Sequence, residues 1–331
     1  MDEQNLDAYK AVRESVGLIA LAERGKIRAS GPDRVSFLHN MISNDVEKLE
    51  EQAGRHSTFL TAQGKIVAEF HIYKLPGFLL LDLDSEAVEK TLATLGKYII
   101  MEEVQLSDCG SEWAHFSLQG PRSAELLKEM AELELPQEHL QARQGKWQST
   151  PLWVIHKADL AEAGFEILVP AGQGEAFRQA ALESGKGFGL RQVGSQARHA
   201  LRVESGIPLY GAELDESRYP MEARLEDALD FNKGCYIGQE VVAKATYIGG
   251  VARLLARLRM EGRLVPPVGS GLLDPGGKKV GILTSSAYSP SLERPIALGY
   301  VRKKYALAGQ PLVVSVADGD PIQAQVVERF L

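Results

Sequence analysis

The residues of this chain best suited to chemistry lie in one short run, residues 232–240, which reads NKGCYIGQE. Glycines flank its cysteine on both sides, so the backbone there can turn sharply or approach a ligand closely. The following residues, 239–247, predict a helix, so Cys235 would precede a helix N-terminus with Lys233 two residues away. A helix dipole and a nearby cation both stabilise a thiolate, which predicts a reactive cysteine. A tight turn in which a small buried cysteine fills space is an equally good interpretation.

A second candidate is the acid in the run LRVESGIPL, residues 201–209. Glu204 stands between apolar residues and a Gly-Ile-Pro turn, and a carboxylate buried there needs hydrogen-bond donors or a cation. It could accept two adjacent N–H groups from a flat heterocycle such as a pterin. It could instead pair locally with Arg202 or Arg198. The sequence leaves both interpretations open.

Most common catalytic signatures are missing from the chain. It has no P-loop, no G-x-G-x-x-G after a strand, and no H-E-x-x-H, C-x-x-C or G-x-S-x-G motif. The seven histidines are scattered, and two of them, His71 and His156, fall in predicted strands, where a half-buried, hydrogen-bonded histidine is more common than a metal ligand. Two cysteines, Cys109 and Cys235, cannot build a disulfide framework or hold a four-cysteine cluster alone. The sequence therefore predicts no metal site.

The elements that must position these residues repeat along the chain at a constant offset of 89 residues. Pairs that keep this register are Gly31-Pro32 with Gly120-Pro121, Leu38 with Leu127, Gln52-Ala53 with Gln141-Ala142, Leu79 with Leu168, Glu86-Ala87 with Glu175-Ala176, and Gly96-Lys97 with Gly185-Lys186. Each match is weak alone, but a shared register indicates that one unit occurs twice.

Hydrophobic periodicity gives both copies the element order β-α-β-β-α-β, the ferredoxin-like or split β-α-β order. The first copy predicts strands at 26–30, 66–73, 78–83 and 98–106, and helices at 31–42 and 85–95. The second predicts strands at 113–119, 152–156 and 165–169, and helices at 121–130 and 174–182. We therefore expect two related α+β halves, about 25–107 and 112–190, packed together within a region that spans residues 1–250.

The last part of the chain has a different pattern. From residue 251, short β-rich pieces alternate with Gly/Pro turns, at 253–260, 279–284, 295–301, 311–316 and 322–327. This pattern predicts a small all-β barrel over residues 251–331.

Length and composition are those of an ordinary globular protein, with 331 residues of which 44% are hydrophobic and 24% charged. No apolar run approaches the ~18 residues that a membrane span needs. The first ten residues, MDEQNLDAYK, lack the apolar core of a signal peptide. The net charge of −7 argues against broad nucleic-acid binding. We expect a cytoplasmic protein with no membrane partner.

The run KGCYIGQE resembles the signature of the YgfZ-type folate-binding proteins, which are tRNA-modifying or iron–sulfur maintenance factors. The wider chain resembles the glycine-cleavage T-protein (aminomethyltransferase) superfamily. The runs that carry this resemblance are ASGPDRVSFLHNMISNDV at 29–46, LTAQGKIVAEFHIY at 60–73, GFEILVP at 164–170, LRVESGIPLYGAEL at 201–214, PMEARL at 220–225, and GILTSSAYSP and IALGYV within 281–301. The resemblance covers almost the whole chain.

This resemblance implies a folate-binding body with a ring-like centre, a C-terminal β-barrel and tetrahydrofolate, or a derivative, as cofactor. The cofactor-binding residues that it implies are Glu204, Arg202, Tyr236 and Lys244, and the catalytic ones are Cys235 and Lys233. Glu204 would hold the edge of the pterin, and the residues of the cysteine motif would line the same central region. Lys244 would meet the anionic folate tail, unless it is an ordinary solvated cation.

One departure from the family bears on the reaction. Aminomethyltransferases carry a Gly-Gly-x-x-Asp-Asp stretch in which an Asp assists folate chemistry, and the aligned run here is GKIVAE, residues 64–69. Ala68 and Glu69 therefore replace two acids. A carboxylate one methylene longer occupies a different place, and a displacement of ~1 Å can cost ~100-fold in rate. This argues against glycine cleavage. Glu69 could still be a relocated base, but the sequence favours a solvent-facing strand residue.

Three functions follow from these observations. The first is a tetrahydrofolate-binding accessory factor for the assembly or repair of iron–sulfur enzymes, which uses Cys235, has iron–sulfur proteins or their assembly machinery as partners, and affects tRNA modification without direct tRNA contact. The alternative is a folate-dependent one-carbon (aminomethyl) transferase or demethylase. A module that only stores or senses folate would tolerate Cys235→Ala but not Glu204→Ala. The sequence favours the first.

Overall fold

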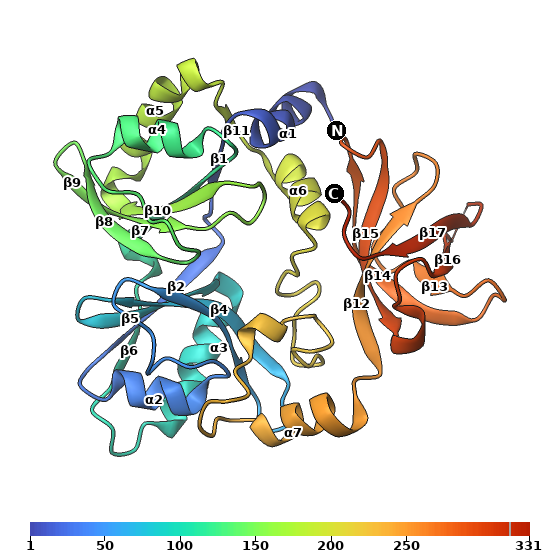
Figure 1. Cartoon of the computed structure of the whole chain (residues 1–331), viewed down its shortest axis with the longest axis horizontal. Helices are drawn as coiled ribbons and strands as arrows, with labels where there is room; N and C mark the ends of the chain where they lie inside the picture. Colours follow the sequence, from blue (N-terminus) through green and yellow to red (C-terminus); the bar gives the residue numbers. More distant parts are fainter. Residues whose placement is uncertain (318) are drawn as a thin grey trace.

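The computed structural model describes residues 1–317 and 319–331, and its two α+β halves stand one above the other beside a β-barrel (Figure 1). A helix and an irregular segment run between the halves and the barrel (Figure 1). The predicted fold class, two α+β halves and a C-terminal barrel, is confirmed.

The first half is a five-stranded antiparallel sheet in the order β3-β4-β5-β2-β6. Its elements are β2 Arg24–Ser30, α2 Arg34–Met41, β3 Gly54–Leu60, β4 Ile66–Leu75, β5 Phe78–Asp84, α3 Ser85–Leu95 and β6 Gln105–Asp108. Apolar residues of α2, α3 and one face of the sheet form a shared core. Since successive side chains of a strand point to opposite faces, Ala68, Phe70 and Ile72 enter this core, while Glu69 and His71 lie on the other face.

The second half is a six-stranded sheet in the order β11-β1-β7-β10-β9-β8. Its elements are β1 Gly17–Ala20, β7 Trp113–Gln119, α4 Ser123–Met130, β8 Ala142–Trp147, β9 Thr150–His156, β10 Gly164–Pro170, α5 Gly174–Ser184 and β11 Arg191–Gln192. Corresponding elements begin 89 residues apart: β2 and β7, α2 and α4, α3 and α5. Strand β1 precedes the first half in sequence, yet it pairs with β7 as β6 pairs with β2, which ties the two halves together.

The sequence pattern missed β3 in the first half and β1, β8 and β11 in the second. Strand β3 buries Ser57 and Thr58, and Thr58 forms a hydrogen bond of 2.7 Å with Ser43, so its buried face is not an apolar run. The strand predicted over 98–106 is largely wrong, because only Gln105–Asp108 is strand. Its apolar residues Ile100 and Met101 are 84% and 89% exposed.

The C-terminal part is a closed barrel in the order β12-β15-β14-β13-β16-β17, in which β17 pairs back with β12. Its strands are β12 Arg253–Met260, β13 Gly271–Leu273, β14 Lys279–Ser289, β15 Arg294–Arg302, β16 Pro311–Ser315 and β17 Ile322–Val327. Closure leaves no free sheet edge within the barrel. Helices α1 (Glu3–Glu14) and α6 (Ser195–Ser205) share an apolar core with barrel residues and so join the barrel to the halves.

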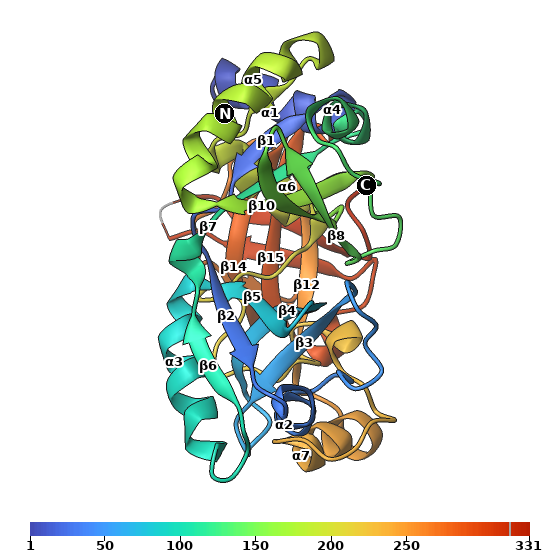
Figure 2. The same ribbon diagram turned by 90° about the vertical axis from the view of Figure 1, so that its left-hand side faces the viewer.

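The segment between α6 and the barrel is mostly irregular and runs down beside the first half to α7, at the lower edge of Figure 1. It ends in helix α7, Gln239–Lys244, which continues as a π-helical turn through Gly249. The helix predicted from residue 239 is therefore present. Figure 2, turned by 90°, shows the second half above the first, with the barrel behind them. No helix in the described residues is long and apolar enough to cross a membrane.

Candidate functional site

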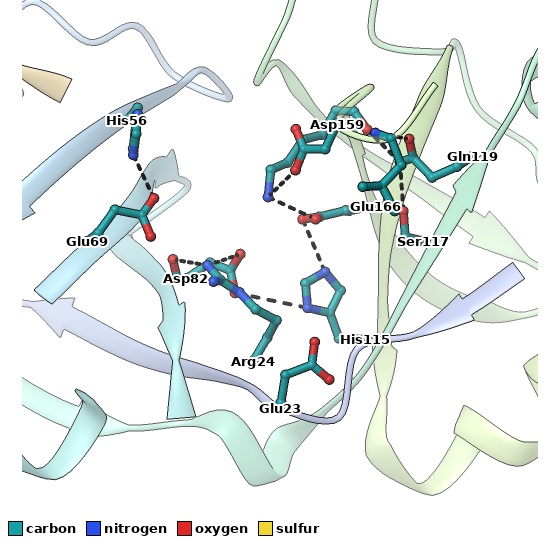
Figure 3. Close-up of polar contacts among 12 residues, drawn as sticks. Glu23, Arg24, His56, Glu69, Asp82, His115, Ser117, Gln119, Asp159 and Glu166 are labelled. Atoms are coloured by element: carbon teal, nitrogen blue, oxygen red, sulfur yellow. Dashed lines mark hydrogen bonds and ion pairs between the residues drawn. The ribbon is translucent and has the colours of Figure 1, made fainter. Parts of the chain in front are cut away.

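A cavity of about 360 Å³ opens where the cavity-facing sides of the two sheets meet the segment around 205–209 and 224–227. This volume is typical of small-molecule sites. Polar residues from both halves converge there (Figure 3). The cavity has two chemically different walls, one built on the first sheet and one on the second.

The first wall is built from β3 and β4. His56 and His71 are directly opposite each other in the register of these strands, and their rings stack with centroids 4.9 Å apart. The Nε2 atom of His56 lies 2.6 Å from Oε1 of Glu69, and its Nδ1 atom lies 2.8 Å from Oδ2 of Asp227. Figure 3 shows His56 and Glu69 facing each other beside the cavity.

Electrostatics on this wall follow from that pairing. Burial lowers the pKa of His56, but hydrogen bonds to Asp227 and Glu69 outweigh it and raise that pKa to about 10, so the ring is a cation at neutral pH. Burial raises the pKa of Glu69, but the hydrogen bond and charge of His56 outweigh burial and lower that pKa below its usual value, so Glu69 is ionised. Burial, together with the nearby charges of Lys157 and His56, holds the pKa of His71 well below its usual value, so that ring is neutral.

The second wall and the seam between the halves form a chain of ion pairs. Nζ of Lys26 lies 3.1 Å from Nδ1 of His115, and these two residues, 89 apart, hold the same position in the two halves. Nε2 of His115 lies 3.2 Å from Glu166, and Nζ of Lys157 lies 2.9 Å from Glu166. At the seam, Asp82 pairs with Arg24 at 3.0 Å and with Lys26 at 3.6 Å.

The carboxylates of this second group are therefore matched by cations. Burial raises the pKa of Glu166, but Lys157 and His115 outweigh burial and lower it to about 2. Burial likewise opposes the ionisation of Asp82, yet Arg24 and Lys26 hold its pKa well below the usual range. Removing one partner of such a buried pair leaves an uncompensated charge.

Of the six site residues predicted from sequence, Arg202 lines the cavity. Its guanidinium donates hydrogen bonds to the carbonyl of Ile207, to Glu213 at 3.1 Å and to Ser285 at 2.6 Å. The guanidinium therefore holds α6 against the following segment and β14.

Glu204 lies elsewhere, in a closed set of hydrogen bonds between α1, α6 and β14. Its carboxylate accepts hydrogen bonds from the hydroxyl of Tyr9 at 2.7 Å, from Arg13 and from Ser289. The residue is 4% exposed and does not line the central cavity. Its carboxylate thus has a full set of partners within the protein, and the predicted contact with a pterin stays a prediction.

The cysteine motif lies against α2 and the loop before β4. The ammonium of Lys233 donates to the carbonyls of His39, Ile42 and Asn44, at and just after the C-terminal end of α2. Burial lowers the pKa of Lys233 to about 8. Gly238 has φ of 84°, and a Cβ there would lie 2.6 Å from the carbonyl of Thr61, so only glycine fits this approach.

The other residues of this region lie outside the central cavity. Cys235 is exposed, and Tyr236 is buried in a separate apolar cluster. Lys244 is exposed and pairs with Glu240 at 2.6 Å. The structure therefore does not bring Cys235 and Glu204 into one cleft, and the roles predicted for Cys235, Lys233, Tyr236 and Lys244 stay predictions.

Sequence reasoning considered Glu69 only as an alternative base and missed other residues that line the cavity, although two signals could have found them. Glu69 and His71 have the i, i+2 spacing that places two side chains on one face of a strand. Glu166 is a lone acid inside the apolar strand GFEILVP, and a buried acid must have partners. No local signal marks the residues that complete the site, which are His56, Lys157, Asp159 and Asp227.

Comparison with known proteins assigns the family. Residues 1–233 match the GCVT N-terminal domain and residues 253–331 match the glycine cleavage T-protein C-terminal barrel domain. The chain therefore belongs to the glycine cleavage T-protein family.

Two relatives and one solved structure show how far this likeness extends. The aminomethyltransferase of Caldanaerobacter subterraneus is 28% identical over 99% of this chain and 87% of its own length. That of Chloroherpeton thalassium is 29% identical over 93% and 85%. The crystal structure of the glycine cleavage system aminomethyltransferase T from Bartonella henselae superposes with a TM-score of 0.90, at 25% identity, over 98% of this chain and 89% of that one.

These comparisons correct the sequence analysis on one point. The wider resemblance to the T-protein superfamily is confirmed, and with it tetrahydrofolate as the cofactor expected for the family. The narrower resemblance to the YgfZ-type branch, drawn from the run KGCYIGQE, is wrong, because proteins named aminomethyltransferase match nearly the whole chain. An eight-residue run is a weaker criterion than similarity along 330 residues.

Proposed function

We propose that this protein is a folate-dependent aminomethyltransferase that works in the central cavity. The observation that carries the proposal is the position of Glu69. It lies on the cavity wall, at the end of the run that aligns with the acid pair of the family. The chain around it is similar to named aminomethyltransferases over nearly its whole length.

The geometry of β4 weakens the sequence argument against transfer. Ala68 is fully buried in the apolar core of the first half, on the face that points away from the cavity. An acid at position 68 would enter that core, so Ala68 removes no carboxylate from the cavity. Glu69 is the residue of the pair that faces the site, and there the carboxylate is kept with one extra methylene.

The residues that line the cavity fit a reduced pterin. A pterin has flat apolar faces and an edge rich in N–H donors. Ile19, Leu21 and Leu160 supply apolar surface, and Glu69 supplies a carboxylate acceptor. The Nδ1 atom of His71 is buried without a hydrogen-bond partner, so the wall has polar capacity left for a ligand.

The opening towards the barrel suits the anionic tail of folate. Arg224 and Arg257 line this side of the cavity. The hydrogen bonds of Arg224 go to the carbonyl of Leu255, and those of Arg257 to the carbonyls of Glu328 and Ser205. Within the described residues neither guanidinium forms an ion pair with a carboxylate. Both charges are free to bind the carboxylates of the glutamyl tail.

Bound tetrahydrofolate would supply the amine that takes up the one-carbon unit. Glu69 would accept a hydrogen bond from the bound ring and hold the proton that the transfer releases, as general bases do. His56 keeps that carboxylate ionised and fixes its orientation.

The residues that the sequence singled out have positioning roles in this proposal. Glu204 joins α1 and α6 to the barrel, and Lys233 ties the cysteine motif to α2. Gly238 packs on the loop that leads into β4, so the motif supports the strand that carries Glu69. Nothing in the comparisons supports iron–sulfur proteins as partners or an effect on tRNA modification. A cytoplasmic location stays a prediction.

The test is aminomethyl transfer by pure protein. The protein is incubated with tetrahydrofolate and an aminomethylated lipoyl carrier protein, and methylene-tetrahydrofolate and ammonia are measured. Wild type should turn over, and Glu69→Gln, which keeps the shape but loses the base, should lose ~100-fold or more in kcat. Glu183→Gln, an exposed acid on α5, is the matched control and should match wild type. Wild type that binds tetrahydrofolate yet forms neither product would contradict the proposal.

A further inference from the structure

Three side chains on the first wall bring metal-binding atoms together. One ring nitrogen of His56, one of His71 and one carboxylate oxygen of Glu69 lie within 4.8 Å of one another. All three residues line the central cavity. The strand register produces this arrangement, because His56 pairs with His71 across β3 and β4, and Glu69 precedes His71 by two residues on the same face.

Two imidazoles and one carboxylate form a ligand set that divalent transition metals prefer. Zinc takes such a set and keeps a fourth position for water or substrate, and a facial set of the same composition holds Fe²⁺. Donor atoms around a tetrahedral zinc ion lie about 3.3 Å apart, since each bond is about 2.0–2.1 Å long. Small rotations of the three side chains would reach this spacing.

A fourth residue has the position of an outer partner. Metal-bound histidines usually donate their second N–H to a carboxylate, which fixes the ring and makes it a better ligand. Asp227 lies 2.8 Å from Nδ1 of His56, on the side of the ring opposite Glu69. The structure thus has the carboxylate–histidine pair that accompanies many metal sites.

In a second cluster near the cavity, cationic side chains of the protein occupy the place that a metal ion would take. Asp82, His115 and Glu166 also bring donor atoms within range of one another. Cations of the protein already occupy that cluster, since Arg24 and Lys26 pair with Asp82, and Lys157 pairs with Glu166. Around Glu69, in the part of the chain that the structure describes, no lysine or arginine forms an ion pair.

We propose that His56, Glu69 and His71 bind one divalent transition-metal ion, such as Zn²⁺, with Asp227 orienting His56. On binding, the proton shared by Nε2 of His56 and the carboxylate of Glu69 leaves to solvent, and both atoms become ligands. The open coordination position faces the cavity and would take water or an oxygen or nitrogen atom of a bound molecule. The inference goes beyond the proposed function, since a metal-bound Glu69 would be a ligand and not the free base of the transfer. The metal is therefore measured without folate or donor, so that failure of one proposal is distinguished from failure of the other.

The experiment titrates metal-free protein with Zn²⁺ by calorimetry and with Co²⁺ by visible absorption. Wild type should bind one ion with a Kd of about 1 μM or tighter, release about one proton, and show the visible bands of tetrahedrally bound Co²⁺. His71→Ala and Glu69→Gln should weaken binding by ~100-fold or more, and Asp227→Asn by ~10- to 100-fold. Thermal unfolding of each metal-free variant checks that it folds.

Two further variants separate this site from weak binding elsewhere. His199→Ala removes an exposed histidine on α6, and Cys235→Ser removes the exposed thiol, and both should bind as wild type does. If wild type shows no saturable binding up to millimolar metal, the proposal is wrong. It is equally wrong if a folded His71→Ala binds like wild type, or if Cys235→Ser abolishes binding.

Discussion

The two walls of the central cavity carry similar residue types but differ in how their charges are satisfied. On the second wall, Glu166 has Lys157 at 2.9 Å and His115 at 3.2 Å, so protein cations neutralise it. On the first wall, Glu69 has His56 as its ion-pair partner, at 2.6 Å, and no ammonium or guanidinium within ion-pair distance among the described residues. A carboxylate whose charge is matched by lysine and histidine side chains stabilises the fold, whereas a carboxylate that can still accept hydrogen bonds is available to a ligand.

The largest difference that we expect between the two walls is in the free energy of unfolding. Glu166→Gln would leave the buried ammonium of Lys157 with only Asp159, at 3.2 Å, as its carboxylate partner. We expect a loss of about 3–5 kcal/mol in the free energy of unfolding. Glu69→Gln should lose less than Glu166→Gln does, because the carboxylate of Asp227 still pairs with His56. Urea denaturation of both variants measures the difference, and similar losses would show that the two walls are equivalent.

The pH dependence of the free energy of unfolding gives a second test of the ion pairs on the second wall. The pKa of Glu166 is about 2 in the folded protein and about 4.5 when unfolded. A lowered folded pKa stabilises the protein above the unfolded value, and that stabilisation is lost as the pH falls from about 4.5 to 2. The difference corresponds to a loss on the order of 3 kcal/mol. Glu166→Gln should flatten this part of the curve, and an unchanged slope would contradict the role of Glu166.

A smaller effect concerns the side of the cavity next to the barrel. Arg257 carries a charge that no carboxylate of the described residues pairs with, so Arg257→Met should weaken binding of a polyglutamylated tetrahydrofolate about 10-fold. The effect on the monoglutamate should be smaller. Arg259→Met, two residues along β12 and outside the cavity, is the control. Equal Kd values for Arg257→Met and wild type would place the folate tail elsewhere.

The sequence predicted the two halves and the barrel because these depend on periodic burial and on repeated turns. It missed β3, whose buried face carries Ser57 and Thr58, and it extended β6 backwards over the exposed Ile100 and Met101. Polar residues that are buried and apolar residues that are exposed both break the rule that hydrophobic periodicity relies on.

The site was harder to predict than the fold. The sequence predicted catalytic roles for Cys235 and Lys233 because glycines flank them. In the structure, Gly238 allows the backbone to approach the carbonyl of Thr61, and Lys233 donates hydrogen bonds to carbonyls at the end of α2. The cavity joins His56, Glu69 and Glu166 across two halves, and no local pattern contains that juxtaposition. The repeat offset was the strongest available clue, since Lys26 and His115, 89 residues apart, meet between the halves.

A crystal structure of the tetrahydrofolate complex would show whether the cavity between the walls holds the reduced folate. We expect pterin density between the two sheets, with a ring nitrogen within hydrogen-bond distance of Glu69 and the glutamyl tail directed towards Arg224 and Arg257. Density beside Glu204 or Cys235, or an empty cavity in crystals that contain the ligand elsewhere, would contradict it.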